Sequence, residues 1–224
     1  MAPDMAYVLN GSRLHVWAHR FPGVFAFCVP VTVLVSLLVV KVLAPVVPDL
    51  LADLGEFHLR EFRGLAVHNF TPLGLVAGAA LGALSHVVLD SFTHEWGWFA
   101  RHLSWYSDPL GDSRWLGRRW SMFRIVQYLG HVGGSALCVG LLWRYGRQRW
   151  MRASAALVEP VPSTLRTHLL LWSCTAAGAI AGISWVYTDS AGVASDVLRV
   201  SETTFAGMCV GAFAVTRLAP APTA

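Results

Sequence analysis

The sequence predicts an all-α protein, a polytopic transmembrane helix bundle with four or five spans plus interfacial helices. Of its 224 residues, 55% are hydrophobic and only 13% are charged, whereas about a quarter of the residues are charged in an ordinary soluble domain. The mean hydropathy is +0.52. Residues 21–40 contain no charged side chain, and a run of about 20 residues is long enough to cross a bilayer. These observations exclude a soluble enzyme, a disordered chain and a nucleic-acid-binding domain.

Five apolar segments account for the predicted spans. They cover residues 21–44, 73–92, 125–145, 167–188 and 203–216. Thr71 and Pro72 open the second segment as its N-cap and first-turn proline. The fifth segment has only 14 uncharged residues, which is short for a span, so the number of spans is four or five.

Two connections between these segments are predicted to lie along the membrane surface. In residues 49–62, apolar side chains recur at helical spacing against charged ones, which is typical of an interfacial helix. Residues 95–120 carry six tryptophans and tyrosines among arginines, and such residues favour the headgroup level. We expect one transmembrane helical domain over residues 1–218 and a disordered tail over residues 219–224.

The net charge of +4 does not indicate a nucleic-acid partner, because the arginines lie in short loops beside apolar runs. Such arginines contact membrane lipid, which is the partner we expect. Lys41 is the only lysine, a bias typical of GC-rich bacterial genomes, so a multi-pass protein of the bacterial cytoplasmic membrane is expected. The basic residues divide almost equally between the two sides, so the positive-inside rule does not give the orientation.

The most informative feature is a row of residues spaced by four in the second segment. The row consists of Gly74, Gly78, Gly82, His86, Asp90 and His94. Residues at this spacing share one stripe of a helix, so the glycines predict close approach of another helix and the ionisable residues should face protein. His86 and Asp90 are about 6 Å apart along the axis and can share a metal ion, whereas His94 is about 12 Å from His86.

Two other pairs have the same spacing, and they lie near the ends of other segments. They are His15 with His19, before the first segment, and Gln127 with His131, at the start of the third. A chain that crosses the membrane and returns brings His19, Asp90 and His131 to one face, where Asp4 also lies. The sequence therefore predicts that ionisable residues from distant parts of the chain converge at one membrane face.

Three motifs resemble a bacterial membrane family known as domain-of-unknown-function family 4184. They are SHVVLDSFTH at residues 85–94, HRFPG at residues 19–23 and QYLGH at residues 127–131. The pattern is more remotely similar to LexA-regulated inner-membrane metal-dependent hydrolases, which carry a Pro-Asp motif, a histidine pair and a Ser-His-x-x-x-Asp motif. Those motifs correspond here to Pro3-Asp4, to His15 with His19, and to His86 with Asp90.

The resemblance also bears on the start of the chain. In the family, about a helix's worth of residues with a further histidine precedes the Pro-Asp motif, whereas Pro3 here follows almost directly on Met1. This leads us to expect that the natural start lies upstream of Met1.

The first functional hypothesis is a membrane metal-dependent hydrolase that acts on a lipid-like or phosphoester substrate. Its metal ligands would be Asp4, His19, His86 and Asp90, while His94 or His131 would be a second-site ligand or a general acid–base group. Mixed nitrogen and oxygen ligands suit zinc or manganese better than calcium.

Two alternatives stay open. A small transporter could pass protons or a metal ion through His86, Asp90 and His131, although the other half of such a path is bare of polar residues. A non-catalytic scaffold could use the same stripe only to fix helix register.

Overall fold

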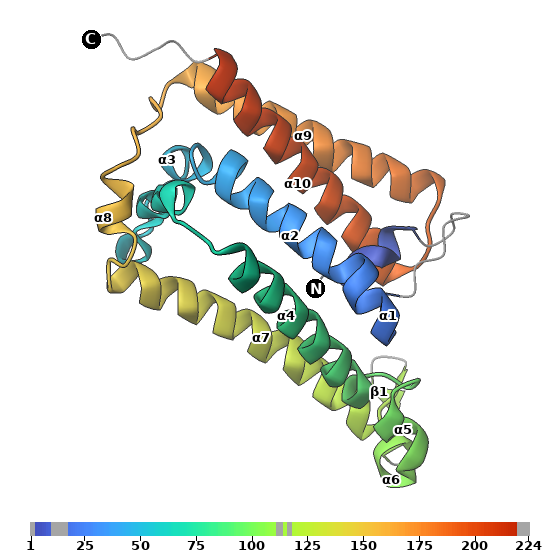
Figure 1. The fold of residues 1–224 in the computed structure, drawn as a ribbon. Helices are drawn as coiled ribbons and strands as arrows, with labels where there is room; N and C mark the ends of the chain where they lie inside the picture. The colour runs from blue at the N-terminus through green and yellow to red at the C-terminus, as the bar shows by residue number, and fades with distance from the viewer. Residues whose placement is uncertain (1–2, 10–17, 111–113, 116–117, 219–224) are drawn as a thin grey trace.

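The computed structural model of the protein describes residues 3–9, 18–110, 114–115 and 118–218 (Figure 1). Within these residues, four helices are long and apolar enough to cross a membrane, as the sequence predicts. They cover Phe21–Leu43, Pro72–His102, Met122–Arg147 and Leu165–Thr188. The chain is thus an all-α membrane protein.

The first span is one continuous helical stretch built from α1 (Phe21–Gly23), η2 (Val24–Cys28), α2 (Val29–Leu38) and η3 (Val39–Leu43). The short segment η1 (Asp4–Leu9) precedes it. The remaining elements are α3 (Val47–Leu50), η4 (Gly55–Phe57), η5 (Leu59–Val67), α4 (Pro72–Thr93), α5 (Trp98–His102), α6 (Ser104–Ser107), β1 (Arg114–Trp115), β2 (Arg118–Arg119), α7 (Met122–Arg147), α8 (Arg152–Ala155), α9 (Leu165–Thr188) and α10 (Val193–Leu218).

The long helices run alternately in opposite directions, so the molecule has two faces. The N-terminal face carries η1, the start of the first span and the end of α4, and the opposite face carries α3 and α8 (Figure 1). The start of α4 is as predicted, because the Thr71 hydroxyl accepts a hydrogen bond from the Gly74 backbone N–H at 3.1 Å and Pro72 opens the first turn. This cap fixes where the helix that carries the polar stripe begins.

The fifth segment is longer than the 14 residues predicted. Helix α10 has 26 residues and begins ten residues before the predicted segment. Its first turns contain charged residues whose side chains pair with other groups of the protein. Asp196 accepts a hydrogen bond from the Ser190 hydroxyl at 2.6 Å, and Arg199 pairs with Asp189 at 3.3 Å. Counting charges therefore underestimated the length of this helix.

The glycines of α4 do not receive another helix, contrary to the prediction. A Cβ atom on Gly78 or Gly82 would meet no described atom within 4 Å. The close approach occurs instead between α9 and α10, where a Cβ on Gly178 would lie 2.3 Å from the Thr203 carbonyl oxygen and one on Gly207 would lie 2.4 Å from the Cys174 carbonyl oxygen. Small residues permit such packing, but they do not identify which helices use it.

The predicted interfacial helix over residues 49–62 is also wrong as a single element. The segment forms α3, η4 and the start of η5, with residues 52–54 between them not helical. Asp49 turns inward and is buried, since its carboxylate pairs with Arg63 at 2.7 Å and accepts a hydrogen bond from the Val161 backbone N–H at 2.9 Å. This inward bond and the positive φ of 44° at His58 interrupt the regular helix.

The tryptophan-rich connection forms a small lobe of α5, α6 and the antiparallel pair of β1 with β2 at the N-terminal face (Figure 1). Trp98 and Trp105 are mostly exposed there, and the expectation that this lobe lies along the membrane stays a prediction. The tail over residues 219–224 lies outside the described residues.

Two clusters of buried side chains connect the elements. At the N-terminal face, Ala18, Val24 and Cys28 pack against Ala83 of α4. Toward the opposite face, residues of η3 and α3 pack against α9 and α10 around Leu171, which is fully buried. The first cluster holds together the elements that carry the candidate site.

Candidate metal centre

Four ionisable side chains from three separate segments meet at the N-terminal face. Asp4 comes from η1, His19 lies two residues before the start of α1, and His86 and Asp90 come from consecutive turns of α4. One ligand atom from each of the four lies within 4.8 Å of every other. The structure thus brings together the four residues that the hydrolase hypothesis names as metal ligands.

The distances within this His/Asp cluster are short and reciprocal. His19 Nε2 lies 3.4 Å from Asp4 Oδ1 and 3.3 Å from Asp90 Oδ2. His86 Nε2 lies 3.2 Å from Asp4 Oδ2 and 3.3 Å from Asp90 Oδ2. Each histidine nitrogen therefore faces a carboxylate oxygen from both aspartates.

Local sequence explains why these side chains converge. The α-helical spacing of four residues places His86 above Asp90 on one face of α4. Ala18 is buried and its carbonyl oxygen accepts a hydrogen bond from the Cys28 thiol at 3.4 Å. This hydrogen bond holds the residues before α1 against the first span, whose buried side chains pack on Ala83 of α4. His19 therefore lies beside α4.

The electrostatics at Asp4 favour the ionised form of this residue. Burial alone would raise the pKa of the Asp4 carboxyl, but side-chain hydrogen bonds with His19 and His86 hold it well below its usual range. Asp4 is therefore a carboxylate at neutral pH, which is the ligand form. The centre offers two carboxylates and two imidazoles.

The chemistry of the donor set fits a divalent cation. Asp90 Oδ2 is buried and accepts no hydrogen bond from a described residue, although two imidazole nitrogens lie at 3.3 Å. Unsatisfied buried oxygens are rare in native structures, whereas a cation between the ligands would satisfy such an oxygen. Two nitrogen and two oxygen ligands match the number that zinc takes in tetrahedral sites.

His94 lies at the edge of this cluster rather than within it. Its Nδ1 atom is 3.5 Å from Asp90 Oδ1 and 3.1 Å from the Thr93 hydroxyl. Its Nε2 atom is 3.3 Å from the Gln127 side-chain nitrogen. Because an amide nitrogen donates and does not accept, Gln127 is the donor in this contact, and Nδ1 is the ring nitrogen that faces Asp90.

His131 is not brought to the cluster. It lies on the exposed surface of α7, one turn beyond Gln127, and makes no hydrogen bond or ion pair to a described residue. Of the predicted pair, Gln127 faces the site and His131 does not. The other unplaced residue, His15, lies outside the described residues.

Two aromatic residues that sequence reasoning missed surround the histidines. The ring centroid of Tyr7 is 5.2 Å from that of His19, and Trp96 stacks on His94 at 5.0 Å and meets His19 edge-on at 5.9 Å. Burial and the negative charges of Asp4 and Asp90 raise the pKa of Tyr7, so its phenol keeps its proton. The position of Tyr7 three residues after Asp4 was the available signal.

The fold and this cluster define a class of protein: an α-helical membrane protein with four helices long enough to span a membrane and, at one end of them, a His/Asp cluster that could hold a metal ion. The chain belongs to the family described as domain of unknown function DUF4184, whose family model matches residues 1–218. No curated protein and no solved structure matches the chain.

Proposed function

We propose that the protein is a metal-dependent hydrolase of the bacterial cytoplasmic membrane that acts on a lipid-like or phosphoester substrate at the membrane face. The observation that carries the proposal is the convergence of Asp4, His19, His86 and Asp90 from three segments, with ligand atoms within 4.8 Å of one another. Ionisable groups in membrane-spanning helices are costly to insert and mark functional sites. The remote resemblance to LexA-regulated hydrolases supports the same reading.

Each of the four cluster residues would supply one ligand atom to the metal ion. Asp4 and Asp90 would supply oxygen ligands and His19 and His86 nitrogen ligands to zinc or manganese. When bound, such an ion polarises the scissile ester or phosphoester and lowers the pKa of its water to about 7.

His94 is the general acid–base group in this proposal. Its ring lies between Asp90, which faces Nδ1, and Gln127, which faces Nε2. Trp96 stacks on one face of the ring. His131 was an equal candidate from sequence, but its exposed position on α7 favours His94.

The site's depth supports a substrate that reaches the membrane surface. His19 precedes the first residue of the first span, and His94 directly follows the last residue of α4. A lipid headgroup occupies this level, whereas a bilayer-centre site would suit a translocated ion. Translocation of a proton or a metal ion is weakened further because residues 72–84 of α4 contain no ionisable side chain.

Metal content by mass spectrometry on detergent-purified protein tests the proposal. Wild-type protein is expected to carry about one equivalent of zinc or manganese, and the double variant His86→Ala/Asp90→Ala to carry none. His102→Ala is the matched control, because this exposed histidine lies at the same face and bonds only to the Trp98 carbonyl among described residues.

The metal contents of the three proteins distinguish the hydrolase from the scaffold. Metal bound by the wild type and the control but lost in the double variant justifies screening ester and phosphodiester substrates, and metal-dependent turnover would establish the hydrolase. Equal metal content in all three proteins, or none in the wild type, would contradict the metal centre and favour the scaffold.

A further inference from the structure

A second feature of the molecule lies at the opposite face, away from the His/Asp cluster. Two adjoining hollows of about 530 Å³ and about 620 Å³ run between α2 and α4. They share five lining residues, Ser36, His68, Asn69, Phe70 and Leu75, so we treat them as one groove, called the α2–α4 groove. Gly78 in its wall is about 12 Å along α4 from His86, the nearer of the two cluster residues on this helix, which separates the groove from the metal centre.

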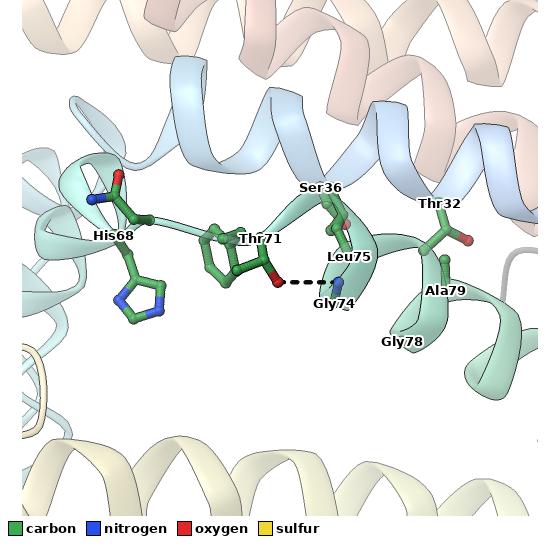
Figure 2. Close-up of a pocket in the computed structure, with 10 residues that line it drawn as sticks. Thr32, Ser36, His68, Thr71, Gly74, Leu75, Gly78 and Ala79 are labelled. Atoms are coloured by element: carbon green, nitrogen blue, oxygen red, sulfur yellow. Dashed lines mark hydrogen bonds between the residues drawn. The ribbon is translucent and has the colours of Figure 1, made fainter.

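The glycines of α4 create this groove. Gly74 and Gly78 line it together with Thr32 and Ala79 (Figure 2), and a Cβ on Gly78 would meet no described atom. Side chains at these positions would fill the space between the two helices. The glycine row that was expected to receive a helix therefore leaves a hollow instead.

The wall of the groove is apolar. Val33, Leu37 and Val40 from α2 and η3 face Leu75 and Val76 from α4. The Thr32 hydroxyl donates to the Cys28 carbonyl oxygen at 2.7 Å, so it presents mainly its methyl group. Such a wall suits a hydrocarbon chain, and the volume lies within the range of about 300–1,000 Å³ that ligand sites occupy.

One end of the groove is polar and positively charged. Lys41 is the only charged residue among the described lining residues, and His68 and Asn69 lie with it. The Lys41 ammonium donates to the Ala66 carbonyl oxygen at 3.4 Å, which uses one of its three N–H donors. A lysine near a span end directs its ammonium to the headgroup level, where it attracts anionic lipid phosphates.

We propose that the α2–α4 groove binds one anionic phospholipid, with an acyl chain between α2 and α4 and its phosphate beside Lys41, His68 and Asn69. An anionic headgroup fits this end of the groove, because Lys41 is positively charged and the described lining residues include no carboxylate. This site is independent of the proposed hydrolase activity, because it lies at the other membrane face.

Native mass spectrometry of detergent-purified protein, titrated with phosphatidylglycerol or phosphatidylcholine, tests the proposal. Wild-type protein is expected to retain one phosphatidylglycerol and to prefer it to phosphatidylcholine about tenfold. Gly78→Leu fills the groove and should reduce phosphatidylglycerol retention about tenfold. Lys41→Gln should still bind lipid but lose the preference between the two headgroups.

Gly82→Leu is the matched control for the groove. Gly82 lies one turn further along α4, also has open space at its Cβ, and does not line the groove. Leu75→Trp, which narrows both hollows, replaces Gly78→Leu if that variant does not fold. Equal retention by the groove variant and Gly82→Leu, or no headgroup preference in the wild type, would overturn the proposal.

Discussion

At the scale of single residues, the aspartate at position 90 is the centre of the site. Its Oδ2 atom faces His19 and His86, while its Oδ1 atom faces His94. One carboxylate therefore connects the metal ligands to the proposed acid–base group. Removing Asp90 should therefore disturb both metal binding and acid–base catalysis, whereas removing His94 should disturb only acid–base catalysis.

We expect His94→Ala to keep its metal and to lose turnover. The four ligand atoms do not include His94, so metal content should stay at about one equivalent. General acid–base groups contribute about 10²–10⁴-fold to rate, and turnover of a substrate found by screening should fall by that factor. Metal analysis beside kinetics on the same preparation measures both effects.

His131→Ala is the comparison for this variant. Since His131 is exposed on α7 and contacts no described member of the site, turnover and metal content should match the wild type. A loss of turnover in His131→Ala equal to that in His94→Ala would reverse the assignment of the acid–base group.

The four cluster residues could be predicted from sequence because helical spacing is a local property. His86 and Asp90 share a stripe by their separation alone, and the alternation of spans placed His19 and Asp4 at the same face. Gln127 and His131 lie one helical turn apart on α7, and the rotation of that helix decides which of them faces the site. Spacing does not fix that rotation, so the sequence could not separate them.

At the scale of elements, the segment η1 depends on a distant helix for its position. Arg199 of α10 is fully buried, donates from Nε to the Val8 carbonyl oxygen at 3.4 Å, and also donates to the Asp189 carbonyl oxygen. Its guanidinium lies 4.7 Å from the centroid of the Trp185 ring. Through Val8, α10 supports the segment that carries Asp4.

We expect Arg199→Met to lower stability by about 1–3 kcal/mol, because hydrogen bonds to a buried charged group are lost. The midpoint of thermal unfolding in detergent measures this. Metal retention during dialysis against a chelator should also fall, since η1 loses its support. Arg217→Met, at the exposed end of α10 beside Phe213, should change stability by no more than about 0.5 kcal/mol.

The positions of the helices were predictable, but their partners were not. Apolar runs and the Thr71 cap gave the spans, because bilayer thickness and backbone hydrogen bonding constrain them strongly. Lipid is as apolar as the helix surfaces, so hydrophobicity does not choose which helices meet. The sequence therefore predicted close packing of another helix against the glycines of α4, whereas the structure has this packing between α9 and α10.

At the scale of the whole molecule, the helices are packed unequally. Helices α9 and α10 form a close hairpin through Gly178, Gly182 and Gly207. In contrast, Phe123 and Gly146, near the two ends of α7, are the only residues of that helix buried by described residues, and no residue of its apolar central stretch is buried. The stability of the fold thus resides mainly away from α7.

Matched glycine substitutions should reveal this difference. In Gly207→Ala the new Cβ would lie 2.4 Å from the Cys174 carbonyl oxygen, and such overpacking costs about 1–3 kcal/mol. Gly134→Ala on α7 enters open space and should be neutral or stabilising by up to about 1 kcal/mol, since alanine favours a helix. The midpoints of thermal unfolding of both variants, measured in one detergent, test this difference. Equal midpoints would contradict the inference that α9 and α10 are packed more closely than α7.

The two halves of the cluster are separated in the chain by two consecutive membrane crossings, which has a consequence for biogenesis. Asp4 and His19 precede the first span, whereas His86 and Asp90 end the second. A chain whose second span failed to cross would leave these two pairs on opposite sides of the bilayer, and neither pair alone provides four ligands. Bound metal would then mark chains whose insertion is correct, and misinserted copies would be recognisable by its absence.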